Sequence, residues 1–313
     1  MNELLTVLTA VLPVFCLVAT GVALRRAEWL TPEADASLMR VVVNVLTPAL
    51  ILDVVLGNAA LRRPENLVLA PLLGFAEVAG GVGLAWLVRR RTGLVSDREQ
   101  RTFAATTGIQ NYGYVPLPLI LSLFPGDTAG VLFVHNLGVD IGLWTVCLVA
   151  LGHGTLREWR RLVSPPLIAI VLALALNALG GDRYLPGFLR KTASMLGVCA
   201  FPLGIVLIGA TMSDSAADLR RHIGGRMAAW AAVLRLGVLP AILLVVAWLV
   251  PSRELKQVLV VQAAMPAAVF PIVLARHYAG DPPTAVRVVI ATSLLGFLTM
   301  PLWLRLGMRL PGL

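Results

Sequence analysis

The chain has 313 residues, of which 58% are hydrophobic and only 14% are charged, and its formal net charge is +9. Soluble proteins are about 25% charged, so the composition excludes an ordinary soluble domain and favours a single membrane domain over residues 1–313. The positive residues lie mainly in short loops between apolar runs, where they orient membrane helices, and this argues against a nucleic-acid partner.

Ten apolar runs follow one another along the chain, each close to the length of about 20 residues that a transmembrane helix needs. They cover residues 4–24, 34–56, 66–88, 99–124, 128–151, 164–181, 187–212, 226–250, 254–276 and 283–306. We therefore expect an all-α membrane protein with ten transmembrane helices. Arginine and lysine are more frequent in the loops that follow odd-numbered segments, which predicts that these loops are cytoplasmic and that both termini lie outside.

Two of the ten segments are interrupted by pairs of prolines. Pro116 and Pro118 divide the fourth segment, and Pro266 and Pro271 divide the ninth. Non-helical backbone at membrane depth is tolerated only where it is buried in protein or lines a water-filled cavity. Proline also suits the first turn of a helix, so each break can create a helix N-terminus, whose partial positive charge attracts anions.

The prolines also indicate an internal repeat. Pro48 precedes Pro116 by about the same distance as Pro202 precedes Pro271. Each half would contain five helices, an odd number, so the second half must be inserted upside down. We expect two inverted five-helix repeats with broken crossover helices 4 and 9 and a site at their interface. The repeats would cover residues 1–153 and 154–313.

Several polar residues lie at or near these breaks. Asn111 and Gln262 would supply amide donors to an anion, and Asn44 is a further candidate in the second segment. The break residues Pro116, Met265 and Pro266 complete the predicted site. The alternative is that the prolines only kink packed helices and that the amides satisfy freed carbonyl groups. Two breaks at matching positions favour the site.

Ionisable residues inside apolar segments are costly and therefore functional candidates. His135 and Asp140 in the fifth segment are predicted to line the cavity, with one of them titrating or contacting the substrate. A polar contact between helices is the alternative for both. Glu77 in the third segment is a candidate for coupling a cation or proton, or else a structural partner of Arg235.

Motifs for other chemistry are missing from the sequence. The three cysteines and four histidines show neither CxxC nor HExxH spacing, and neither a P-loop nor GxGxxG occurs. No nucleophile–base pair or signalling domain supports a membrane enzyme or a sensor. We therefore predict no enzymatic activity, no metal and no cofactor other than a coupling H⁺ or Na⁺.

Three motifs resemble those of the auxin efflux carrier family. The stretch from Gln262 to Asp281, QAAMPAAVFPIVLARHYAGD, is similar to the ninth-helix signature of that family. NVLTPAL, which begins at Asn44, resembles its second-helix motif, and NYGYVPLP, which begins at Asn111, its fourth-helix crossover. The absence of a long central loop resembles bacterial members rather than plant members.

The resemblance implies a fold similar to bile-acid symporters and sodium/proton antiporters, with helices 1, 2, 6 and 7 as a scaffold. Helices 3, 4, 5, 8, 9 and 10 would form a moving transport part. The crossover asparagine of the family corresponds to Asn111, whereas Ala267, Ala268 and Val269 stand where plant members have a second asparagine.

The function that this resemblance implies is secondary active transport of a small organic acid anion, either auxin-like or a mono- or dicarboxylate. Transport would follow an elevator-type alternating-access mechanism in the bacterial inner membrane. A cation/proton antiporter that uses Asp140 and Glu77 is the alternative. The expected partners are the acid and the lipid bilayer, and a homodimer is one alternative for the oligomeric state.

Overall fold

The computed structural model describes residues 3–124, 126–152, 163–181, 185–215 and 225–313, and these residues are helical apart from turns, loops and one isolated β-bridge. The α-helices are α1 (Glu3–Arg26), α2 (Pro32–Val41), α3 (Thr47–Val55), α4 (Pro64–Val88), α5 (Asp97–Gly108), α6 (Pro116–Leu123), α7 (Thr128–Gly142), α8 (Leu148–Ala150), α9 (Pro165–Ala178), α10 (Gly187–Val198), α11 (Ala200–Ser215), α13 (Arg226–Val233), α14 (Leu239–Leu249), α15 (Arg253–Ala263), α16 (Phe270–His277) and α17 (Pro282–Gly307). The prediction of an all-α chain is confirmed for this part of the molecule.

Among the residues that the structure describes, seven helical stretches are long and apolar enough to cross a membrane. They are Leu5–Arg26, Pro32–Val55, Pro64–Arg91, Thr128–Ala150, Gly187–Asp214, Arg226–Leu249 and Pro282–Gly307. The other three predicted segments are shorter or divided: α9 has 14 residues, and the fourth and ninth segments are each split into two helices. Seven spans are thus observed, and the count of ten stays a prediction.

Three spans contain a π-helical turn: η1 (Val42–Leu46), η4 (Leu143–Cys147) and η8 (Leu234–Val238). Two of these turns stand directly before helices that carry proline in their first turn, Pro48 in α3 and Pro240 in α14. A proline inside a helix lacks the N–H and clashes with the carbonyl four residues earlier, and a wider turn relieves that clash. The spans therefore continue through their prolines.

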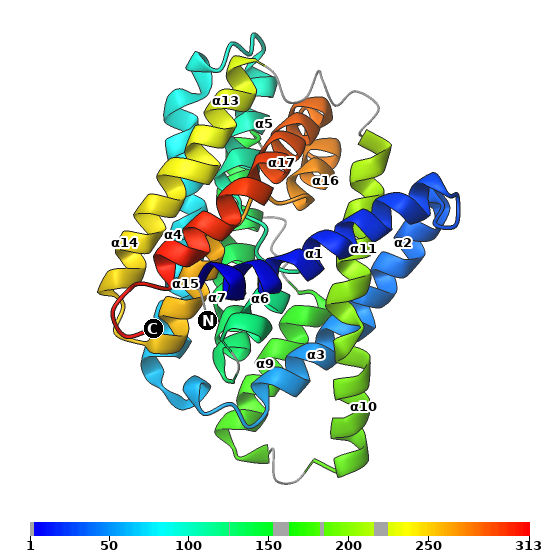
Figure 1. Ribbon diagram of the computed structural model, residues 1–313, viewed down its shortest axis with the longest axis vertical. Coiled ribbons are helices and arrows are strands. Elements are labelled where there is room, and N and C mark those ends of the chain that lie inside the picture. The colour runs from blue at the N-terminus through cyan, green and yellow to red at the C-terminus, as the bar shows by residue number, and fades with distance from the viewer. Residues whose placement is uncertain (1–2, 125, 153–162, 182–184, 216–224) are drawn as a thin grey trace.

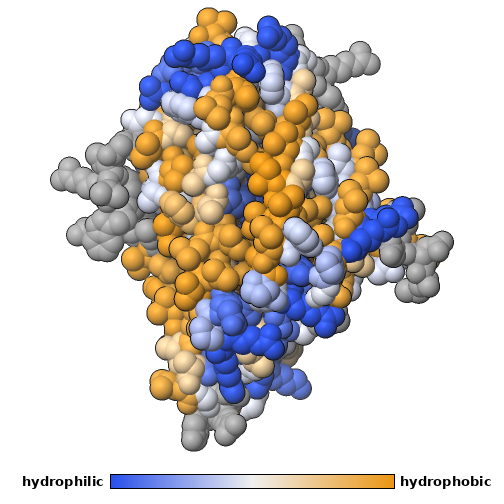
Figure 2. Space-filling view, turned by 90° about the vertical axis from the view of Figure 1, so that its left-hand side faces the viewer, coloured by the Kyte–Doolittle hydropathy of each residue, from blue (hydrophilic) through white to orange (hydrophobic). Residues whose placement is uncertain are grey.

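The helices pack in two groups: Figure 1 shows α4, α5, α13 and α14 toward the upper left and α3, α9 and α10 toward the bottom. In one group α1 packs against α11, and α3 packs against α9 and α10. In the other α4 packs against α5 and α7, α13 against α17, and α14 against α15. In the face shown in Figure 2, apolar side chains cover much of the middle, and hydrophilic residues gather at the upper end and in the lower part.

Helices α4 and α7 approach each other so closely that their backbones touch. A Cβ atom added to Gly138 would lie 1.7 Å from the carbonyl oxygen of Pro71, and one added to Gly74 would lie 2.2 Å from that of His135. Small residues permit this approach in membrane helices. The approach brings the polar residues of α4 next to those of α7.

Candidate functional site

The two interrupted segments cross each other at their breaks. Helix α5 ends at Gly108 and α6 begins at Pro116, while α15 ends at Ala263 and α16 begins at Phe270. Between them, Gln110 and Ala267 form an antiparallel β-bridge.

Two hydrogen bonds join the crossing stretches. The N–H of Asn111 donates to the carbonyl oxygen of Pro266 at 2.8 Å, and the N–H of Ala268 donates to that of Ile109 at 3.0 Å. The breaks would otherwise leave buried backbone groups unpaired, so each stretch satisfies the other. The two stretches are therefore joined directly, backbone to backbone, at the crossing point.

The N-termini of the two short helices face one cavity. Val115 precedes α6 and Val269 precedes α16, and neither helix has a side-chain hydrogen bond at its N-cap. Both residues line the same cavity, together with Asn111 and Pro266. Helix N-termini carry partial positive charge. Few N–H groups are free there, because Pro116, Pro118 and Pro271 have none and the N–H groups of Leu117 and Ile272 donate to the carbonyl oxygens of Gly113 and Val269. None of the described residues that line the cavity is charged.

The remaining walls of this cavity come from three long helices. They are Val14, Phe15 and Val18 of α1, Ile208 and Met212 of α11, and Ser293, Phe297 and Met300 of α17. The rings of Phe15 and Phe297 meet edge to face with their centroids 4.2 Å apart. Apart from Asn111 and Ser293 the described side chains that line the cavity are apolar, so it has a polar end and an apolar side.

The cavity measures about 40 Å³. This is room for about one water molecule, whose share of liquid volume is about 30 Å³. An organic acid is several times larger. Ligand binding therefore requires the lining helices to separate.

Gln262 lies behind the crossover and does not line the cavity. Its buried amide Nε2 donates to the carbonyl oxygen of Tyr112 at 3.3 Å and to Oδ1 of Asn136 at 3.4 Å. Asn136 Nδ2 donates to the same Tyr112 oxygen at 2.8 Å. The two amides thus hold the crossing backbone from the side opposite the cavity. Sequence reasoning missed Asn136, although a polar residue next to His135 in an apolar segment was a visible signal.

Asp140 is also separated from the cavity. Its Oδ1 accepts a 2.8 Å hydrogen bond from the hydroxyl of Tyr112. Tyr112 packs with Trp144 against an apolar cluster that contains no cavity-lining residue. Successive side chains of extended backbone point to opposite sides, so Asn111 faces the cavity while Tyr112 faces Asp140. The structure does not bring Asp140 and Asn111 together.

His135, Glu77 and Arg235 form a buried cluster of ionisable side chains between α4, α7 and η8. His135 Nε2 lies 3.4 Å from Glu77 Oε2, and Arg235 Nη2 lies 4.0 Å from Glu77 Oε1, so Glu77 is the partner of both. Arg235 Nη1 also donates at 3.3 Å to the carbonyl oxygen of Gly108, the last residue of α5. A cation at a helix C-terminus is favourable. The cluster therefore ties the end of α5 to α4 and α7.

The other predicted residues divide between the break and the surface. Pro116, Met265 and Pro266 are all buried, and Pro266 also lines the cavity. Asn44 is exposed on η1 and is not one of the residues that line the cavity. Of the predicted site residues, the structure places Asn111 and Pro266 at the cavity, and Gln262, His135 and Glu77 behind the crossover.

The sequence matches the family described as "Membrane transport protein" over residues 6–152 and 153–304. It is 27% identical over 299 residues to an uncharacterized transporter of Methanothermobacter thermautotrophicus, covering 94% of this chain and 96% of that protein. It is 24% identical over 306 residues to an uncharacterized transporter of Methanocaldococcus jannaschii, with the same coverage of 94% and 96%. Auxin efflux carrier component 1 of Arabidopsis thaliana is 28% identical over 157 residues, which are 48% of this chain and 25% of that protein.

Proposed function

Because this chain belongs to the membrane transport protein family, which includes the auxin efflux carriers, we propose that it is a secondary active transporter for a small organic acid anion. Family membership and the apolar spans make it a multi-pass membrane protein of the transporter class. The finer parts of the proposal are the carboxylate ligand, the mechanism, and an inner-membrane location with both termini outside.

One observation carries the choice of an anion: the uncapped N-termini of α6 and α16 meet at one cavity beside Asn111. Aligned helix dipoles stabilise negative charge without any cationic side chain. The Asn111 amide forms no hydrogen bond with the described residues and is partly exposed, so it can donate to a carboxylate oxygen. In this arrangement the carboxylate lies between the two helix ends.

An elevator-type mechanism is supported by the position of the cavity. On one side it is lined by α1 and α11, and on the other by the crossover and α17. In the proposed mechanism α4–α8 and α13–α17 move as one part relative to α1–α3 and α9–α11. The cavity then opens to each side of the membrane in turn. The similar breaks in the fourth and ninth segments support the further proposal of ten helices in two inverted repeats.

Uptake by purified protein in proteoliposomes tests the function. Radiolabelled benzoate, indole-3-acetate, malonate and malate would be offered in turn, against liposomes without protein. We expect saturable uptake of at least one acid, reduced by an excess of the same unlabelled acid. Uptake equal to that of empty liposomes for every acid, under both proton and sodium gradients, would remove the proposal.

A cation/proton antiporter is the second candidate, and buried Glu77 favours it. Neither oxygen of this carboxylate has a hydrogen-bond partner among the described residues, and its ionisable neighbours are His135 and Arg235. Buried carboxylates in membrane spans commonly mark proton or ion pathways. Sodium-driven collapse of a pH gradient without any added acid, lost in Glu77→Gln or Asp140→Asn, would favour the antiporter. Acid-dependent flux would favour the organic acid carrier, with H⁺ or Na⁺ as its coupling ion.

A further inference from the structure

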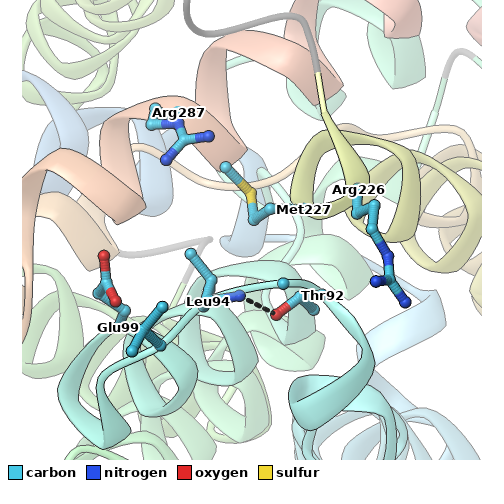
Figure 3. Close-up of a pocket in the computed structure, with 8 residues that line it drawn as sticks. Thr92, Leu94, Glu99, Arg226, Met227 and Arg287 are labelled. Atoms are coloured by element: carbon cyan, nitrogen blue, oxygen red, sulfur yellow. Dashed lines mark hydrogen bonds between the residues drawn. The ribbon is translucent and has the colours of Figure 1, made fainter.

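A second site lies at the end of the molecule where α5, α13 and α17 begin. It is a surface cleft of about 380 Å³ lined by Thr92, Gly93, Leu94, Val95, Glu99, Arg226, Met227 and Arg287. Figure 3 shows Arg287 of α17 and Arg226 of α13 on either side of Met227, with the guanidinium group of Arg226 directed away from Arg287. None of these residues lines the cavity at the crossover, so the two sites are separate.

Two arginines without partners give the cleft its chemistry. Within the residues that the structure describes, neither Arg226 nor Arg287 forms a hydrogen bond or an ion pair through its side chain, and the Nε atom of Arg287 is buried. Burying an unpaired charged donor is unfavourable, so a guanidinium in this position favours an anionic ligand. Two arginines line this cleft, and a guanidinium group suits a phosphate group, which has several oxygens and accepts paired N–H donors.

Glu99 does not neutralise this cleft. Its carboxylate accepts hydrogen bonds from the N–H of Ser96 at 2.9 Å and from the Ser96 hydroxyl at 3.0 Å, as part of the capping box of α5. The lining therefore carries two guanidinium groups and one carboxylate, so positive charge is in excess although Glu99 keeps its own charge. Exposed Arg90 and Arg91 directly precede Thr92 and add positive charge around the cleft.

Apolar exposure at the same place points to a lipid. Val95, which lines the cleft, is 93% exposed, and Leu87 at the nearby end of α4 is 76% exposed. An exposed apolar side chain beside clustered arginines is the arrangement that favours the interface of an anionic leaflet. By the distribution of positive residues this end is the cytoplasmic one, where anionic lipids attract basic segments.

We propose that the cleft binds a phosphate group through Arg226 and Arg287, and that the headgroup of an anionic phospholipid supplies it. Such a group bridges the start of α13 to the start of α17 beside the loop after α4. It thereby stabilises the packing of helices that are distant in sequence. The proposal depends on neither the substrate nor the transport cycle.

The test is the thermal stability of the purified protein in nanodiscs of phosphatidylcholine, with and without one-third phosphatidylglycerol. A double variant, Arg226→Gln with Arg287→Gln, is compared with wild type. The matched control is Arg190→Gln with Lys191→Gln, which removes two exposed positive charges from α10, at the other end of the molecule (Figure 1). A separate arm adds 10 mM inorganic phosphate to the phosphatidylcholine discs.

We expect phosphatidylglycerol to raise the Tm of wild type and of the control by about 2–4 °C, and to leave the double variant unchanged. Stabilisation by inorganic phosphate alone would support the phosphate site and assign it to a soluble ligand rather than to a lipid. Equal stabilisation of the double variant, or none of wild type by either ligand, would overturn the proposal. If the double variant does not fold, Arg226→Gln alone, at an exposed position, repeats the comparison.

Discussion

The backbone N–H of Asn111 donates a 2.8 Å hydrogen bond to the carbonyl oxygen of Pro266, which joins the two broken segments at their crossing point. Because this bond uses only backbone atoms, the side chain of Asn111 is fixed in position but free to meet a ligand. The same crossing places the uncapped N-termini of α6 and α16 at one cavity. The backbone of Asn111 thus holds the crossing point, while its side chain is available to bind the substrate.

Replacing Asn111 by alanine should therefore weaken substrate binding without unfolding the protein. Loss of one hydrogen bond to a charged group is worth about 1.5–3 kcal/mol, so KM for the transported acid should rise roughly 10- to 100-fold. The Tm should stay within about 2 °C of wild type, since the backbone bond to Pro266 remains. Asn44→Ala is the matched control, because Asn44 is exposed and away from the cavity. Unchanged KM in Asn111→Ala would remove this residue from the site.

Gln262 should behave differently, because it supports the crossover from behind. Gln262→Ala removes hydrogen bonds to Tyr112 and Asn136, and we expect a loss of about 1–3 kcal/mol in the free energy of unfolding. Asn136→Ala should cost a similar amount, and the double variant less than the sum, since both amides donate to the same Tyr112 oxygen. Chemical denaturation in detergent measures all three variants. Strict additivity would show that the two amides act independently.

The sequence allowed the helical class and the position of both breaks to be predicted, because hydropathy and proline act locally. Pro116 begins α6, and Pro271 is the second residue of α16, as expected for proline in a first helical turn. The sequence did not allow us to predict which polar residues at the crossover line the cavity and which ones support the backbone from behind. Which face of a helix meets its neighbour depends on packing between distant segments. Asp140 therefore seemed a cavity residue, yet it bonds Tyr112 on the other side of the crossover.

The same limit applies to the apolar wall of the cavity. Phe15 and Phe297 come from opposite ends of the chain, and nothing local marks them as partners. The pairing of Glu77 with Arg235 was one of two alternatives from the sequence, and the 4.0 Å separation of their charged atoms supports it. A role for Glu77 in coupling stays a prediction.

The Glu77–Arg235 pair predicts a non-additive effect on stability. Arg235→Met leaves the buried Glu77 carboxylate without its cation, and removing one partner of a buried ion pair costs about 3–5 kcal/mol. Adding Glu77→Gln removes the remaining charge and should recover most of that loss. Chemical unfolding of the two single variants and the double variant checks this. A double variant less stable than Arg235→Met would contradict a direct pairing.

The close approach of α4 and α7 predicts opposite effects for two glycines. Gly138→Ala places a Cβ 1.7 Å from the backbone oxygen of Pro71, which cannot move without separating the helices, so the protein should lose stability or fail to fold. Gly80→Ala on α4 meets no atom within 4 Å and should gain up to about 1 kcal/mol from helix propensity. The Tm values of the two variants, compared with that of wild type, test both expectations. A Gly138→Ala protein as stable as wild type would mean that the backbones do not touch.

The shape of the cavity makes a final prediction about the substrate. Its polar end has Asn111 and two helix N-termini, whereas Phe15, Phe297 and Met212 make its side apolar. A second carboxylate on the ligand would lose its hydration against these side chains without gaining a partner. A monocarboxylate with an apolar or aromatic body should therefore compete for uptake at least 10-fold better than a dicarboxylate of similar length. Competition by benzoate against malonate, and by indole-3-acetate against malate, measures this preference. Phe297→Ala should reduce this preference. It should weaken the competition by the aromatic acids alone, because the Phe297 ring provides contact area but no charge. Equal competition by both classes would place the carboxylate elsewhere than at the helix N-termini.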